Sequence, residues 1–129
     1  MRRLAFALLA ATLAFGAGAA EPAPIEPAAL NARVAWADRS LVVLDVRTPE
    51  EFAAGHVPGA INIPHTELAA RIAELGDARD RDVVVYCRTG RRSELALGVL
   101  EQSGFRRLFH LQGDYTRWSE EKRPVVKTE

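Results

Sequence analysis

The segment 83–93, VVVYCRTGRRS, contains the only cysteine of the chain, Cys87. A run of β-branched and aromatic residues precedes this cysteine, and a glycine, three arginines and a serine are among the residues that follow it. The thiolate is the nucleophilic form of cysteine, and a helix N-terminus or nearby cations can lower a thiol pKa from about 8.5 to roughly 3.5–7.5. The segment therefore predicts a cysteine that ionises readily and acts as a nucleophile.

The residues after Cys87 also predict a loop that binds anions. Gly90 allows a tight turn in which successive N–H groups face one point, and the helix expected from about Arg91 directs the positive end of its dipole there. Arg88, Arg91 and Arg92 add positive charge, which is unfavourable at a helix N-terminus unless a negative group lies nearby. The alternatives are a cysteine that packs as a small hydrophobic residue and arginines that are only the solvated start of a helix. The order of strand, cysteine, glycine, arginines and helix favours the reactive thiol.

The expected elements place Cys87 at the end of a buried strand. Apolar runs predict strands over 41–44, 60–63, 83–86 and 108–111. Helical spacing and capping residues predict helices from residue 27, over 49–54, up to residue 75, over 91–102 and after residue 113. This alternation indicates an α/β fold with a mostly parallel sheet and helices on both faces. Ligands of such sheets bind beyond the carboxyl ends of the strands, which is where Cys87 is expected.

Capping and packing signals refine these elements. Thr48, Pro49 and Glu51 fit a capping box with proline at the first helical position, and Thr66 fits the cap of the helix that ends near residue 75. The side chains that we expect to face the core are three aromatic residues, Trp36, Phe52 and Trp118, and three residues of the 91–102 helix, Leu95, Val99 and Leu100.

Length and charge bound the class of protein. A chain of 129 residues predicts one domain, and its 17 basic residues balance 17 acidic ones, so nothing favours a nucleic-acid partner.

Residues 1–20 fit a signal peptide, with Arg2 and Arg3, an apolar stretch over 4–15 and small residues over 17–20. The apolar stretch is too short to span about 30 Å of hydrocarbon. We therefore expect cleavage after Ala19 or Ala20, export, and no membrane attachment afterwards. The features favour a bacterial periplasm as the destination, and full secretion is the alternative.

Several motifs together resemble the rhodanese homology domain. The loop 87–93 fits the active-site pattern C-x-x-G-x-x-S of that family, and the upstream segments 45–47, 51–52 and 55–64 (DVR, EF and GHVPGAINIP) match its other motif. The segment 111–113 with Trp118, followed by Pro124-Val125, resembles the closing motif. The resemblance covers 27–126, after an extended lead-in at 21–26 and before a tail at 127–129. It implies a three-layer α/β/α fold with a mostly parallel central sheet.

The resemblance, closest to small exported thiosulfate sulfurtransferases, implies an enzyme. It implies that Cys87 attacks the outer sulfur of thiosulfate, expels sulfite, and passes sulfur from its persulfide to cyanide or a thiol. No metal or organic cofactor is implied. The remaining loop residues are expected to bind the anionic donor or cradle the anion: Arg88, Thr89, Gly90, Arg91, Arg92 and Ser93. Asp45 and Arg47 are expected to form a supporting ion pair, together with Glu51.

Three other interpretations stay open at this point. The first is a sulfur carrier or redox-sensing module for one partner, the second is a rhodanese-fold phosphatase, and the third is an arsenate reductase. The last two use C-x5-R, and the sixth residue after Cys87 is Ser93 rather than arginine, which makes them the weakest. Asp114 stands where relatives often have a second glycine, a departure expected to affect only the local turn. His56, His65 and His110 lack the spacing of a metal site.

Overall fold

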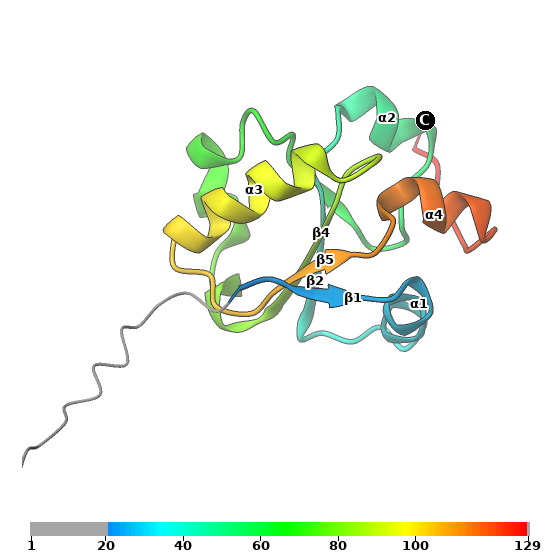
Figure 1. Cartoon of the computed structure of the whole chain (residues 1–129), viewed down its shortest axis with the longest axis horizontal. Helices are drawn as coiled ribbons and strands as arrows, with labels where there is room; N and C mark the ends of the chain where they lie inside the picture. Colours follow the sequence, from blue (N-terminus) through cyan, green and yellow to red (C-terminus); the bar gives the residue numbers. More distant parts are fainter. Residues whose placement is uncertain (1–20, 129) are drawn as a thin grey trace, which may run out of the picture.

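A computed structural model describes residues 21–128, which fold around a five-stranded parallel sheet (Figure 1). The strand order across the sheet is β1-β5-β4-β2-β3. The strands are β1 (Ala23–Ile25), β2 (Leu41–Asp45), β3 (Ile61–Asn62), β4 (Asp82–Tyr86) and β5 (Leu108–Leu111). The extended stretch before Pro27 thus includes an edge strand that pairs with β5. The α/β class and the parallel sheet predicted from the sequence are confirmed.

Helices cover both faces of the sheet and give three layers (Figure 1). The helical elements are α1 (Pro27–Ala35), α2 (Pro49–Ala54), α3 (Arg91–Gln102), α4 (Asp114–Glu120) and two 3₁₀ segments, η1 (Ala69–Leu75) and η2 (Ala78–Asp80). One hydrophobic cluster packs α3 and η1 against one face through residues such as Leu75, Leu97 and Leu100. A second cluster packs α1 and α4 against the other face through Leu30 and Trp118. No helix among residues 21–128 is long and apolar enough to cross a membrane.

The two central strands bring the candidate residues to one edge. β2 and β4 pair from Leu41 opposite Asp82 to Asp45 opposite Tyr86. Residues 41–44 of β2 and 83–86 of β4 form apolar runs, as expected for parallel strands in the middle of a sheet, which are buried on both faces. Their carboxyl ends therefore lie side by side, and Asp45 from one strand meets the residue just before Cys87 from the other.

Helix α2 forms as its capping residues predict. The Thr48 hydroxyl accepts a hydrogen bond from the Glu51 N–H at 3.2 Å, and the Glu51 carboxylate accepts one from the Thr48 N–H at 3.3 Å. These bonds satisfy two of the N–H groups that a helix start leaves without an intrahelical partner. The predicted capping box is confirmed.

Three local predictions are wrong. Trp36 is 85% exposed, because it follows the last residue of α1 and lies outside the helical stripe that packs on the sheet. Leu95 is 56% exposed, because α3 buries the stripe of Ser93, Ala96, Leu97 and Leu100 instead. Thr66 caps no helix, since η1 begins after Leu68 and has no side-chain cap.

The C-terminal segment is fastened across the loop that follows α2. His56 and Val126 exchange two backbone hydrogen bonds of 2.9 Å each, and the Thr128 N–H donates to the Ala53 carbonyl. The Trp118 indole N–H donates to the Pro124 carbonyl at 2.9 Å. The C-terminal segment therefore ties α4 to the loop between α2 and β3.

Candidate active site

Cys87 lies in the loop between β4 and α3, as predicted. The Gly90 N–H donates to the Cys87 Sγ at 3.0 Å, and Gly90 has a φ of +122°, a region that side chains rarely adopt. The sulfur thus faces the backbone of its own loop at the N-terminus of α3, where the helix dipole favours negative charge. The Cys87 side chain is 1% exposed and also contacts the cluster under α3. The sulfur is therefore shielded from solvent, with the Gly90 N–H as its hydrogen-bond donor on the side of the loop.

The three arginines of the loop have different surroundings. Arg88 and Arg91 are exposed, and within residues 21–128 their side chains form no ion pair. Arg92 forms two hydrogen bonds with the Glu51 carboxylate, at 2.7 and 3.0 Å. Glu51 is therefore the negative group expected near the helix start. The sequence analysis expected Glu51 to join the ion pair of Asp45 and Arg47. The structure corrects this expectation, because Glu51 pairs with Arg92 instead.

The Arg92–Glu51 pair carries strong charge coupling. The hydrogen bonds from Arg92, with help from Thr48, lower the pKa of Glu51 to about 2. The same contact raises the pKa of Arg92, with a smaller contribution from Cys87. Arg92 consequently remains charged beside the sulfur while its guanidinium is held by Glu51. Arg88 and Arg91 are left as the cations that an incoming anion can bind.

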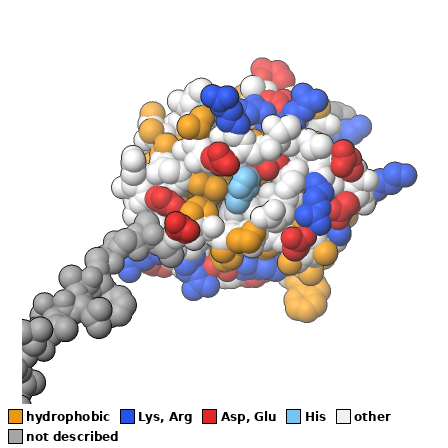
Figure 2. Space-filling model, viewed as in Figure 1, with side chains coloured by type: hydrophobic (Ala, Val, Ile, Leu, Met, Phe, Trp, Pro, Cys, Tyr) orange, Lys and Arg blue, Asp and Glu red, His pale blue; other side chains and the backbone are white. Residues whose placement is uncertain are grey.

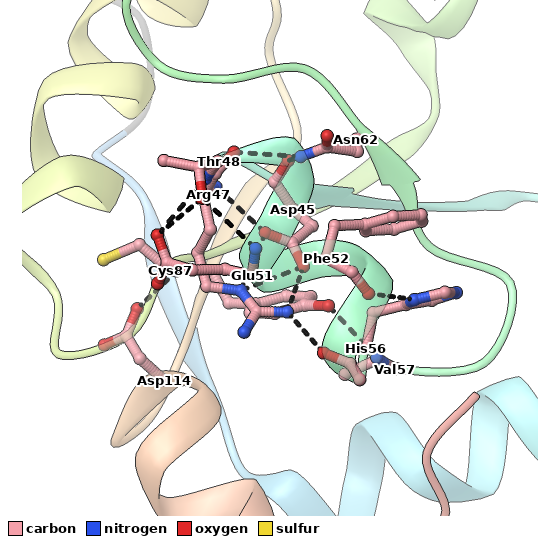
Figure 3. Close-up of polar contacts among 12 residues, drawn as sticks. Asp45, Arg47, Thr48, Glu51, Phe52, His56, Val57, Asn62, Cys87 and Asp114 are labelled. Carbon is pink, nitrogen blue, oxygen red and sulfur yellow. Dashed lines mark hydrogen bonds and ion pairs between the residues drawn. The ribbon is translucent and has the colours of Figure 1, made fainter. Parts of the chain in front are cut away.

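A buried ion pair supports the site from below (Figure 3). The Arg47 guanidinium contacts the Asp45 carboxylate with an N–O distance of 2.6 Å and donates to the Gly55 carbonyl at 2.7 Å. The Asp45 carboxylate also accepts from the Arg47 backbone N–H. Asn62 donates to the Asp45 and Arg47 carbonyls at 3.0 Å each. The ends of β2 and β3 are thereby joined to the loop after α2.

Two tyrosines complete this support. The Arg47 guanidinium lies 4.1 Å from the centre of the Tyr115 ring and 5.5 Å from that of Tyr86, within the range of cation–π contact. The Tyr86 hydroxyl accepts from the Val57 N–H at 3.0 Å. Burial raises the pKa of Tyr86, so its phenol stays neutral. Arg47 therefore has a structural place under the loop, and its side chain also lines the space beside the loop.

Asp114 does far more than shape a turn, which corrects the expectation from the sequence. Its Oδ1 accepts from the Cys87 backbone N–H at 3.0 Å (Figure 3). The same oxygen accepts from the Ser93 hydroxyl at 2.8 Å. Its two carboxylate oxygens each lie 3.0 Å from the His110 Nε2. Asp114 adopts the left-handed conformation with φ of +52°, a region that glycine enters without strain and that aspartate enters more readily than most residues.

The contacts of Asp114 were missed because they join segments far apart in the chain. The only local signals were the departure from glycine at 114 and the four-residue spacing from His110. The Ser93 hydroxyl is buried and donates to Asp114, so Ser93 supports the loop from behind. Thr89 is exposed.

Opposing effects set the charges of this cluster. Burial alone would raise the pKa of Asp114, but hydrogen bonds from His110, the Cys87 N–H and Ser93 together lower it. The hydrogen bond to Asp114 raises the pKa of His110, against the opposing effect of its own burial. The pair is therefore a carboxylate and an imidazolium over a range of pH around the usual histidine value of 6.5.

This pairing predicts a pH-dependent stability. A histidine whose pKa is raised on folding stabilises the protein fully below its unfolded-state pKa, and that contribution is lost as the pH rises through the folded-state pKa. We expect the free energy of unfolding of wild type to exceed that of His110→Gln most below the usual histidine pKa of about 6.5, and to approach it as the pH rises through the raised pKa of folded His110. Urea unfolding at a series of pH values measures the difference. A difference that stays constant across this range contradicts the prediction.

A cavity of about 450 Å³ opens beside the loop, between α2 and α4. Its lining includes Glu51, Arg88, Tyr115 and Thr116. The Tyr115 N–H donates to the Cys87 carbonyl at 2.9 Å, and the Thr116 hydroxyl donates to the Arg88 carbonyl at 2.9 Å. The start of α4 thus fixes the outer backbone of the cysteine loop next to a space of small-molecule size.

The histidines serve separate local contacts. The His56 ring stacks on Phe52 with centroids 3.6 Å apart, and its Nδ1 lies 2.8 Å from the Phe52 carbonyl. His65 is half-buried in a turn. Within residues 21–128, no three histidine, cysteine or acidic side chains gather as a metal ion would need.

Comparisons with known proteins identify relatives over most of the chain. Residues 26–121 match the family model of the rhodanese-like domain. A sulfurtransferase of Allochromatium vinosum is 38% identical over 105 residues, which cover 81% of this chain and 95% of the relative. A putative mitochondrial thiosulfate sulfurtransferase of Schizosaccharomyces pombe is 32% identical over 94 residues, covering 64% of this chain and 66% of the relative. A rhodanese-related protein of Thermoplasma volcanium has a crystal structure with a TM-score of 0.69 at 35% identity, covering 81% of this chain and 97% of that one.

Proposed function

This chain belongs to the rhodanese-like domain family, and we propose that it is a thiosulfate sulfurtransferase that carries the transferred sulfur on Cys87. The family and its sulfurtransferase relatives support a transferase that moves sulfur. Thiosulfate as the donor and a persulfide on Cys87 are the proposal. No metal or organic cofactor takes part in it.

One observation carries the proposal: the Cys87 Sγ accepts the Gly90 N–H at the start of α3. A backbone N–H, a helix dipole and Arg92 all favour negative charge at this sulfur. The same groups would stabilise the anionic terminal sulfur of a persulfide. Preorganised dipoles of this kind lower the energy of charged intermediates without reorganising during the reaction.

The reaction proceeds in two displacements. The Cys87 thiolate attacks the outer sulfur of thiosulfate, so a new S–S bond forms while the S–S bond of thiosulfate breaks and its electron pair leaves with sulfite. Cyanide or a thiolate then attacks the terminal sulfur of the persulfide. The new bond to sulfur forms, the persulfide S–S bond breaks, and the Cys87 thiolate is restored. Splitting one transfer into two steps is the advantage of a covalent intermediate.

Arg91 is the residue that we propose for capture of the donor, because it is exposed at the start of α3 and has no ion-pair partner within the described part of the chain. We expect Arg91→Ala to raise the KM for thiosulfate about tenfold and to change kcat much less. The reason is that a charge contact of equal strength to bound thiosulfate and to the transition state contributes to binding and not to the chemical step. Arg106→Ala is the matched control, because Arg106 is an exposed arginine near the opposite end of β5. Steady-state kinetics at varied thiosulfate concentration measure both. An unchanged KM would remove Arg91 from the donor site.

Intact-mass spectrometry tests the function itself. We expect the protein without residues 1–20 to gain the mass of one sulfur atom after incubation with thiosulfate, and to lose it again on addition of cyanide. Many thiocyanate molecules per protein would identify an enzyme, whereas a single one would identify a sulfur carrier for one partner. No mass gain, combined with hydrolysis of an aryl phosphate, would identify a phosphatase and overturn the proposal.

We also propose export to the bacterial periplasm. The signal-peptide features lie in residues 1–20, outside the residues that the structure describes. We expect protein purified from its own cells to begin at Ala20 or Glu21. Intact-mass measurement checks this, and a full-length chain in the cytoplasmic fraction would contradict it.

A further inference from the structure

We propose that Asp114 and His110 act as a positioning pair for Cys87: Asp114 fixes the backbone of the cysteine loop, and the charge of His110 cancels the carboxylate charge that would oppose an anion on the sulfur. The inference rests on the proposed role of Cys87 as a nucleophile. It adds a pH-dependent control of that nucleophile by two residues outside the loop.

The contacts of Asp114 join every element around the loop. Its carboxylate binds the Cys87 N–H after β4, the Ser93 hydroxyl in α3 and the His110 ring in β5, while its own backbone begins α4. The side chain is buried, and Asp114 is 2% exposed. A buried carboxylate is costly unless hydrogen bonds and a counter-charge compensate it. The fourfold connection indicates a residue that determines the shape of the loop.

The carboxylate also lies close to the sulfur in an electrostatic sense. Gly90 separates the two groups: its N–H donates to the Cys87 Sγ at 3.0 Å, and a Cβ placed on it would lie 3.1 Å from the Asp114 Oδ2. A bare carboxylate on one side of Gly90 therefore repels a thiolate or persulfide on the other. Such like charges interact strongly where water is excluded.

His110 supplies the compensating charge. Its Nε2 lies 3.0 Å from both Asp114 oxygens, and its pKa is raised chiefly by this hydrogen bond. The other charged group that faces the ring is Glu94 of α3, which also favours the imidazolium. Glu101 of the same helix lines the cavity that His110 enters. On the other side of the loop, Arg92 is paired with Glu51, so its charge is partly neutralised.

Solvent can deliver the proton to His110. The His110 side chain is 26% exposed and lines a cavity of about 390 Å³ between α3 and the segment of β1. Figure 2 shows this face, where a histidine lies among acidic and hydrophobic side chains. His110 can therefore follow the pH of the medium while its partner Asp114 stays buried.

As the pH rises, deprotonation of His110 is expected to destabilise an anion on Cys87, whereas a rising pH by itself favours the anionic form of a thiol. Below the raised pKa of His110 the pair is neutral overall, and an anion on Cys87 is not opposed. Above it, the imidazole is neutral and the Asp114 carboxylate acts alone. The stability of the sulfur anion therefore falls with deprotonation of His110, even though a higher pH by itself favours the thiolate.

The test is the pH dependence of the rate at which iodoacetamide alkylates Cys87, from about pH 5 to about pH 10. Mass spectrometry measures the rate, and each variant's rates are normalised to its own plateau at high pH. We expect His110→Gln to move the midpoint to higher pH, so that the normalised rate at neutral pH falls about three- to tenfold. Asp114→Asn keeps an oxygen for the Cys87 N–H but removes the charge, and we expect it to move the midpoint to lower pH. In the Asp114→Asn background, His110→Gln should have little further effect.

His65→Gln is the matched histidine control, because the His65 side chain makes no hydrogen bond in the described residues. Equal shifts for His110→Gln with and without Asp114→Asn, or no shift for either single variant, would overturn the inference. Near-ultraviolet circular dichroism shows that each variant is folded. Alkylation requires no sulfur donor, so a failure of the proposed transferase reaction remains distinguishable from a failure of the positioning pair.

Discussion

Cys87→Ser should take up no sulfur from thiosulfate and should lower the turnover to thiocyanate by about 10⁴-fold or more, as loss of a covalent nucleophile does. The serine hydroxyl can still accept the Gly90 N–H, so the loop keeps its hydrogen bond. A hydroxyl does not ionise near neutral pH, and it forms no S–S bond. Mass measurement after incubation with thiosulfate and a thiocyanate assay check both expectations.

The folded state of this variant must be verified separately. Cys87 contacts the cluster under α3, and a hydroxyl there is less favourable than a thiol. Thermal unfolding of Cys87→Ser beside wild type shows whether the fold survives. A folded variant that still gains one sulfur atom would show that another group carries the sulfur, and it would overturn the role of Cys87.

Asp45→Ala should destabilise the fold by about 3–5 kcal/mol, the usual cost of leaving one partner of a buried ion pair alone. The Arg47 side chain is almost fully buried, and its guanidinium would lose all three of its hydrogen bonds to the Asp45 carboxylate. Burial lowers and the Asp45 contact raises the pKa of Arg47, and the net change is a rise, so the charge remains. Urea unfolding measures the loss.

Two further variants separate the ion pair from general damage. Replacing both partners, as in Asp45→Leu with Arg47→Met, should recover part of the stability because no buried charge remains. The exposed Arg71–Glu74 pair is the matched control, and Arg71→Ala should cost far less than Asp45→Ala. If Asp45→Ala unfolds at the same urea concentration as wild type, the pair is not a support of the site.

The sequence predicted the parts of the fold that local signals encode. The bounds of α3 and β5 agree with the expected ranges, because glycine at each end and apolar spacing mark them within a few residues. The capping box of Thr48 and Glu51 is equally local. The loop around Cys87 follows from the same logic, since strand, glycine and helix start lie within a single short segment.

The errors occur where long-range contacts decide. Helical spacing allowed more than one apolar stripe on α3, and the sheet selects the one that leaves Leu95 exposed. Glu51 and Arg92 are 41 residues apart, and Asp114 and Cys87 are 27 residues apart, so neither contact has a local signature. The charge network behind the loop could therefore be found only in the folded structure.

The fastening of the C-terminal segment over the loop after α2 has a consequence for dynamics. That loop supplies the Gly55 carbonyl to Arg47 and the Val57 N–H to Tyr86, and Val126 holds it from outside through His56. Backbone amides exchange with deuterated solvent when their hydrogen bonds open. The His56 amide should thus exchange as slowly as amides of regular strands, and its protection would disappear together with that of Val126.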